Sequence, residues 1–84
     1  MILSVYAVYD KLTGFMLPVF KSNDAQAIRD FGYDINSEEM NIINVNPTDF
    51  NLQKIGTYDT NTGVIEPTKI EIIADAGQFI RKDR

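Results

Sequence analysis

The chain carries few side chains that could do acid–base or nucleophilic chemistry. Its 84 residues include no histidine and no cysteine. The usual general base near neutral pH, the thiolate nucleophile and the commonest metal ligands are therefore missing. Four carboxylates lie close together in the sequence, and paired carboxylates can transfer protons or hold Mg²⁺. They are Asp30, Asp34, Glu38 and Glu39.

These four carboxylates stand without the motifs that usually accompany catalysis. The chain contains no phosphate-binding loop and no nucleophile motif around them. We interpret them as a solvated acidic face. The sequence therefore predicts a protein that is not an enzyme and needs no cofactor.

One segment, Asp59-x-Asn61-x-Gly63, is similar to the start of a calcium-binding loop. Such a loop needs its glycine at the sixth position and a bidentate glutamate at the twelfth. Gly63 stands one position early, and Ile70 occupies the place of the glutamate. We therefore predict no metal site.

Aromatic side chains offer a different chemistry. They can stack on the bases of single-stranded nucleic acid while nearby lysine or arginine side chains contact phosphates. Most aromatic residues should fill the core, and Phe20, Phe31 and Phe50 are the strongest candidates. Tyr9 and Tyr58 lie beside turn residues, so we expect them to be partly exposed. The candidate nucleic-acid contacts are Tyr9 and Tyr58 for stacking, with Lys11, Lys54, Lys69, Arg81, Lys82 and Arg84 for phosphates.

The overall charge does not favour nucleic acid. Twelve acidic and eight basic residues give a net charge of −4, whereas attraction to phosphates requires positive charge. Two functions remain open. The protein binds single-stranded DNA through a local basic patch, or it is an acidic protein-interaction module that does not touch nucleic acid.

The aromatic residues must be positioned by strands. Residues 2–9 are rich in Ile, Val and Tyr, which predicts a strand rather than a signal peptide or a membrane span. Residues 15–20 form a second apolar run, and the turn residues between Asp10 and Gly14 favour a hairpin. Pro18 lacks an N–H group, so the second strand should lie at a sheet edge or be bulged.

A helix is predicted over residues 23–32. Ser22 or Asn23 can cap it, and Gln26 follows Asn23 at the spacing of a capping box. Gly32 is a typical stop. The helix should bury Ile28 and Phe31 on one side.

The second half of the chain predicts a second hairpin. Residues 33–46 should form an irregular connection, with a short strand at 40–45 and one turn of helix at 46–49. A strand should then run from Phe50 to Tyr58, with a bulge at Gly56.

After the loop at 59–63, the pattern predicts extended residues at 64–67 and a final strand at 70–74. We expect residues 77–84 to form a loose tail.

One pattern occurs twice. Tyr9-Asp10-x-x-Thr13-Gly14-x-x-x-Pro18 is repeated as Tyr58-Asp59-x-x-Thr62-Gly63-x-x-x-Pro67. Aspartate and threonine side chains can bind backbone N–H groups inside a turn, and glycine adopts the backbone conformation that closes it. We interpret the repeat as two hairpins of one design.

The order and spacing of these motifs resemble the small nonstructural protein of gokushoviruses, microviruses with circular single-stranded DNA genomes. The resemblance comprises Tyr6-Ala7-Val8-Tyr9-Asp10, Pro18-Val19-Phe20, Asn23-Asp24-x-x-Ala27-Ile28-Arg29-x-Phe31, and Asn46-Pro47-x-Asp49-Phe50-x-Leu52-x-x-Ile55-Gly56-x-Tyr58-Asp59-x-x-Thr62-Gly63. It implies a nonstructural role in making or packaging single-stranded genomes in the host bacterial cytoplasm. Viral or host replication or packaging proteins are the implied partners, and no catalytic residues accompany the resemblance.

The sequence as a whole predicts a single α+β domain over residues 1–84. Two β-hairpins should form an antiparallel sheet of about four or five strands, packed by one main helix. A domain of this size has a thin core, which favours self-association, so we expect a homodimer. We expect no contact with membranes.

Overall fold

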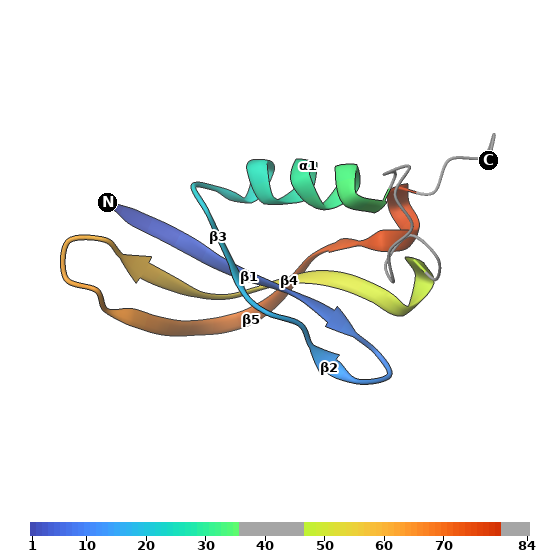
Figure 1. Ribbon diagram of the computed structural model, residues 1–84, viewed down its shortest axis with the longest axis horizontal. Coiled ribbons are helices and arrows are strands. Elements are labelled where there is room, and N and C mark those ends of the chain that lie inside the picture. The colour runs from blue at the N-terminus through green and yellow to red at the C-terminus, as the bar shows by residue number, and fades with distance from the viewer. Residues whose placement is uncertain (36–46, 80–84) are drawn as a thin grey trace.

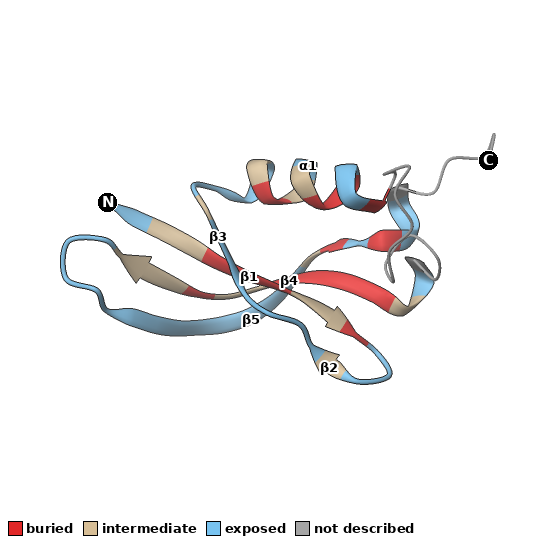
Figure 2. Ribbon diagram, viewed as in Figure 1, coloured by how far each residue is buried: buried red, intermediate tan, exposed pale blue. Residues whose placement is uncertain are grey.

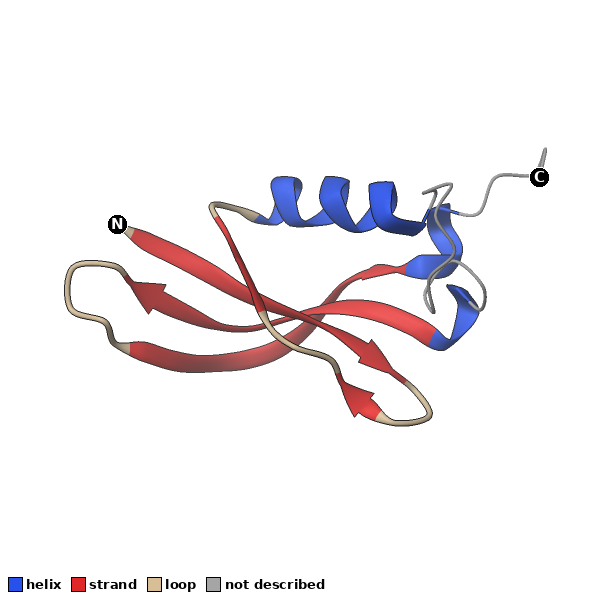
Figure 3. Cartoon of the chain, viewed as in Figure 1, coloured by secondary structure: helices blue, strands red, loops and turns tan. Residues whose placement is uncertain are grey.

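The structure, a computed structural model, describes residues 1–35 and 47–79. It contains one α-helix, five strands and two short 3₁₀ helices in the described residues (Figures 1 and 3). In chain order they are β1 (Ile2–Asp10), β2 (Gly14–Phe15), β3 (Val19–Lys21), α1 (Asp24–Ile35), η1 (Pro47–Asp49), β4 (Phe50–Asp59), β5 (Ile65–Asp75) and η2 (Ala76–Phe79). This is the α+β fold that the sequence predicts.

The five strands form one antiparallel sheet in the order β2-β1-β4-β5, and β3 also pairs with β1. β2 and β3 together form one edge strand of the sheet that is interrupted in the middle. Both lie on the side of β1 away from β4, and they pair with opposite halves of β1. Pro18 lies in the break between them. The backbone N–H of Met16 still donates to Val8 O over 2.8 Å, which holds the break against β1. The prediction that Pro18 marks an edge or a bulge is confirmed.

Helix α1 lies over one face of the sheet, and the core is the layer between them (Figures 1 and 2). The buried cluster contains Ala27, Phe31 and Ile35 from α1, and Tyr6, Phe50, Leu52 and Ala74 from the strands. Burial of this apolar surface is the main force that holds helix and sheet together. In the described residues, no helix covers the opposite face of the sheet.

Of the two predicted capping residues, Asn23 caps α1. Asn23 Oδ1 accepts a hydrogen bond from Gln26 N over 2.8 Å, and Gln26 Oε1 accepts one from Ser22 N over 3.1 Å. The predicted end at Gly32 is wrong, because the helix continues to Ile35. Ile35 is only 3% exposed. Burying it contributes about 1.5–3 kcal/mol, which exceeds the cost of about 1 kcal/mol for a glycine inside a helix.

Strand β4 contains the bulge predicted near Gly56. Val5 pairs with Gly56 while its neighbour Tyr6 pairs with Lys54, so Ile55 is the extra residue of β4. Gly56 also lies against β5, where a Cβ atom added to it would be 2.6 Å from the Glu66 carbonyl oxygen. Only glycine fits this approach without movement of the backbone.

The predicted division of the last strand is wrong. The sequence predicts separate pieces at 64–67 and 70–74, whereas β5 runs without interruption from Ile65 to Asp75. Pro67 is tolerated because β5 is an edge strand. The register shift between Lys54 and Gly56 absorbs the additional residues of β5.

The remaining predictions concern the connections and the tail. The single helical turn expected at 46–49 is present as η1. The strand expected at 40–45 lies outside the described residues. Residues 77–79 of the predicted tail belong to η2, and residues 80–84 lie outside the described range.

Candidate nucleic-acid interface

The two faces of the sheet differ in what covers them. Neighbouring residues of a strand point to opposite faces, and Tyr6 lies in the core beneath α1. Val5 therefore points to the other side, which we call the open face. The strand register assigns to the open face Leu3, Val5, Ala7, Tyr9, Phe15, Phe20, Asn51, Gln53, Tyr58, Ile65 and Ile72.

The open face carries two aromatic pairs. Tyr9 and Phe15 are cross-strand partners, with ring centroids 4.9 Å apart and an interplanar angle of 60°. Phe20 and Tyr58 approach to 5.3 Å at 59°. Phe15 is 50% exposed and Phe20 is 43% exposed, and both tyrosines are intermediate in burial, as predicted.

The aromatic pairs lie toward opposite ends of β1. Tyr58 is opposite Leu3, six residues along β1 from Tyr9, which corresponds to about 20 Å at the rise of a strand. The prediction that Phe20 lies in the core is wrong. Phe20 belongs to the edge strand β3 and is the cross-strand partner of Val5 in β1. Because partners share a face of the sheet, Phe20 faces away from the helix, as Val5 does.

The residues of the open face that lie between the two aromatic pairs are buried. Val5, Ala7, Asn51 and Gln53 are all buried. The two amides satisfy each other in part, since Gln53 Nε2 donates to Asn51 Oδ1 over 2.8 Å. The exposed contact area of this face therefore comes from its larger side chains.

The repeated turn motif lies directly after the tyrosine of each pair. In the first turn Asp10 accepts hydrogen bonds from Leu12 N and Thr13 Oγ1, each over 2.9 Å. In the second turn Asp59 accepts one from Asn61 N over 2.8 Å.

Each turn closes at a glycine with positive φ, 105° at Gly14 and 77° at Gly63. The shared turn chemistry predicted from the repeat is confirmed. It places Tyr9 opposite Phe15, and Tyr58 opposite Ile65.

The structure separates Lys54 from Tyr58, although four residues of a regular strand would place both on one face. The extra residue Ile55 reverses the alternation between them. Lys54 consequently lies on the helix side, with its Nζ 3.6 Å from Asp24 Oδ1. Tyr58 faces the other way, against Phe20.

The other predicted phosphate contacts are scattered. Lys11 is exposed in the first turn, near Tyr9, and its Nζ donates to Thr48 O over 3.1 Å. Lys69 is exposed on β5. Arg81, Lys82 and Arg84 lie outside the described residues.

Two carboxylates of α1 each form an ion pair with a lysine of the sheet. Asp24 accepts a hydrogen bond from Tyr6 Oη over 2.5 Å, in addition to its ion pair with Lys54. Burial of Tyr6 and this hydrogen bond raise the pKa of its hydroxyl to about 12. Lys21 Nζ lies 2.8 Å from Asp30 Oδ2 and lowers the pKa of that carboxyl.

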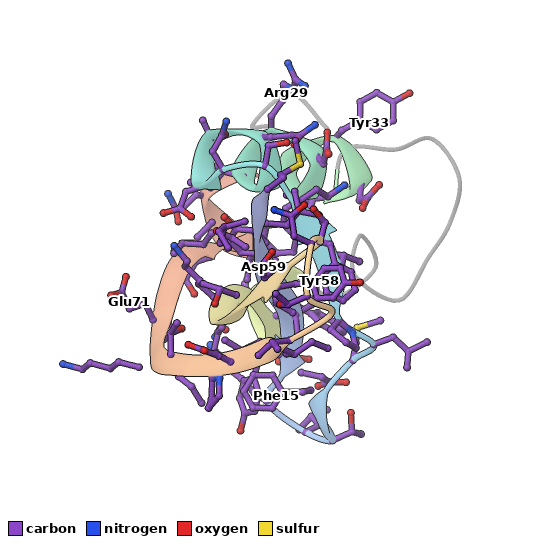
Figure 4. All side chains as sticks on the ribbon, turned by 90° about the vertical axis from the view of Figure 1, so that its left-hand side faces the viewer. Phe15, Arg29, Tyr33, Tyr58, Asp59 and Glu71 are labelled. Carbon is purple, nitrogen blue, oxygen red and sulfur yellow. The ribbon has the colours of Figure 1, made fainter. Side chains whose placement is uncertain are left out.

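Phe15 and Phe20 also lie on the open face, although only Tyr9 and Tyr58 were predicted from the sequence to stack on bases. The signal for Phe15 was the first turn, because a hairpin closed at Asp10 and Gly14 makes Tyr9 and Phe15 partners. In Figure 4, Phe15 lies at the opposite side of the molecule from α1, whose outer surface carries Arg29 and Tyr33.

Two other features are absent from the described part of the chain. In ranges 1–35 and 47–79, no cluster of three or more acidic, histidine or cysteine side chains is arranged to hold a metal ion. Within the same ranges, no helix has the length and apolar character that crossing a membrane requires.

Comparison with known proteins identifies a family. The model of a family described as "Phage ORF5 protein" matches residues 3–79. No curated protein and no solved structure matches the chain. The matched region includes both hairpins and α1.

Proposed function

Because this chain belongs to the Phage ORF5 protein family, we propose that it is a phage accessory protein. From the arrangement of its aromatic side chains, we further propose that it binds single-stranded DNA. The bases would stack on the aromatic pairs of the open face. The protein would act in the synthesis or packaging of a single-stranded genome.

The observation that carries this proposal is the position of the aromatic pairs. Four rings lie on a sheet face that no helix covers in the described residues, and each keeps part of its surface exposed. Stacking on such rings contributes about 1–3 kcal/mol per base and tolerates any base. A sheet face with rings at both ends suits a strand of DNA that runs along it.

Phosphate contacts would come from basic residues that no carboxylate neutralises in the described structure. Lys11 is close to Tyr9, and Lys69 lies on β5. Arg81, Lys82 and Arg84 would add contacts from the C-terminal end. With a net charge of −4, attraction must be local, and binding should weaken as salt rises.

The resemblance to the gokushovirus nonstructural protein supports a cellular location and a set of partners for this activity. We propose that the protein works in the host bacterial cytoplasm, together with viral or host replication or packaging proteins. It would act by binding alone, without a catalytic step or a cofactor.

The test is a fluorescence anisotropy titration with labelled single-stranded DNA at low and moderate salt, with duplex DNA as competitor. We expect saturable, salt-sensitive binding that prefers single strands. The substitution Tyr58→Ala should raise the Kd for single-stranded DNA about tenfold, because the stacking on this ring is lost. Tyr58→Phe keeps the ring and should retain most of the affinity.

Tyr33→Ala is the matched control, because Tyr33 is an equally large aromatic residue exposed on the outer side of α1 (Figure 4). It should leave the Kd unchanged. Absence of binding at low salt would refute the proposal. Equal losses in Tyr58→Ala and Tyr33→Ala would refute the assignment of the open face.

A second function is favoured by the charge arrangement. Lys21 and Lys54 are both engaged by carboxylates, and the chain is acidic overall. The protein could therefore bind a replication or procapsid protein without touching nucleic acid. A nuclease-resistant complex with one viral protein, in a chain that does not bind DNA, would support this alternative.

A further inference from the structure

Strand β5 ends the sheet with a free edge. It pairs with β4 on one side and has no neighbour on the other among the described residues. All of its residues from Ile65 to Ile72 are exposed. The unpaired N–H and C=O groups of such an edge can accept another strand.

The exposed side chains of β5 are unusually apolar for an edge. Ile65, Ile70 and Ile72 are 61%, 55% and 60% exposed. Single exposed apolar residues are common, but several on one strand favour contact with another molecule.

The charged residues of β5 favour a second copy of the same strand as the partner of this edge. Lys69 and Glu71 flank Ile70, and neither forms an ion pair within the described part of the chain. An antiparallel copy of the same strand, centred on Ile70, would place Lys69 opposite Glu71 of the second copy. The two-fold axis generates the reciprocal pair, and opposite charges facing each other across a ladder are stabilising.

We propose that two copies of this chain associate through β5, antiparallel and centred on Ile70, to form one continuous sheet. Ile70 then meets its own counterpart, and Thr68 meets Ile72 of the second copy. Pro67 lacks an N–H group and limits the ladder to residues 68–72. Figure 4 shows that Glu71 projects away from the body of the molecule, as this contact requires.

This pairing has a consequence for the open face. A two-fold axis perpendicular to the sheet keeps equivalent faces on the same side, so the open faces of both copies would be contiguous. The aromatic pairs would then form one surface across the dimer. The association itself does not depend on DNA binding.

The test is the molar mass of the full chain by sedimentation equilibrium over a range of concentrations. The wild-type chain should be a dimer in equilibrium with monomer. Lys69→Glu and Glu71→Lys each place like charges opposite one another at two positions, so each should raise the dimer Kd about tenfold. The double variant K69E/E71K restores opposite charges and should restore the wild-type Kd.

Mixing the two single variants provides a second readout, because their strands are complementary and should form a heterodimer with about the wild-type Kd. Arg29→Glu, a charge reversal on the outer side of α1, should leave the Kd unchanged. Circular dichroism checks that every variant is folded. A wild-type monomer at all concentrations would overturn the proposal, as would single variants with unchanged mass or a double variant without recovery.

Discussion

Tyr6 is the largest fully buried side chain in the described structure, and its hydroxyl donates to Asp24. Burial and this hydrogen bond raise its pKa from 10.0 to about 12. The neutral hydroxyl is therefore favoured by folding. Its contribution is fully present below pH 10 and is lost as the pH rises through 12.

We expect the free energy of unfolding to fall by about 1 kcal/mol per pH unit between pH 10 and 12 because of Tyr6. Chemical denaturation across this range measures it. Tyr6→Phe should cost about 1 kcal/mol at about pH 8 and should show a shallower fall. Other titrating groups are common to both proteins, so parallel profiles would contradict this role for Tyr6.

At the scale of the element, the start of α1 depends on the side chain of Asn23. Its oxygen satisfies the backbone N–H of Gln26, which has no partner inside the helix. Asn23→Ala should lower the free energy of unfolding by about 1 kcal/mol. Asn23→Asp keeps the acceptor and should be nearly neutral in the same denaturation experiment. Equal losses in both variants would exclude capping as the cause.

The bulge of β4 is the second element with a specific requirement. A methyl group on Gly56 would meet the carbonyl of Glu66, and that atom belongs to the backbone of β5. Gly56→Ala should therefore destabilise the protein by about 1–3 kcal/mol, measured by urea unfolding.

Gly77→Ala is the control for Gly56→Ala, because nothing lies within 4 Å of an added Cβ there. It should change the stability by less than about 0.5 kcal/mol. If both variants behaved alike, the close approach at Gly56 would not be the limiting contact.

For the whole molecule, the main feature is a sheet covered on one side only in the described residues. Helix α1 supplies the core on that side, while the other side and the β5 edge keep large apolar residues exposed. In Figure 2 most of β5 is coloured as exposed. A domain of this size cannot bury all of its apolar surface. The aromatic pairs and the β5 edge are two different parts of this surface, so base stacking and the dimer can occur together. Lys69 is common to both proposals, since in the dimer it would face Glu71 of the second copy rather than a phosphate.

The local features of this protein could be predicted from the amino-acid sequence. The two turns, the cap at Asn23, the helical turn at Pro47 and the break at Pro18 each depend on residues close together in the chain. The partial exposure of Tyr9 and Tyr58 followed from their places beside those turns. Local hydrogen bonds and the fixed φ of proline suffice to specify such features.

Which side chains share a face depends instead on how the strands and the helix pack. One extra residue, Ile55, places Lys54 beneath the helix and Tyr58 on the opposite side. The register of β3 likewise exposes Phe20, and the packing of Ile35 carries α1 past Gly32. A bulge changes every later position of its strand, because side chains alternate with a period of two. Gly56 indicated the bulge, but not which side chains it would place on each face. The sequence carries no comparable signal for the register of β3 or the packing of Ile35, since these outcomes depend on contacts between segments far apart in the chain.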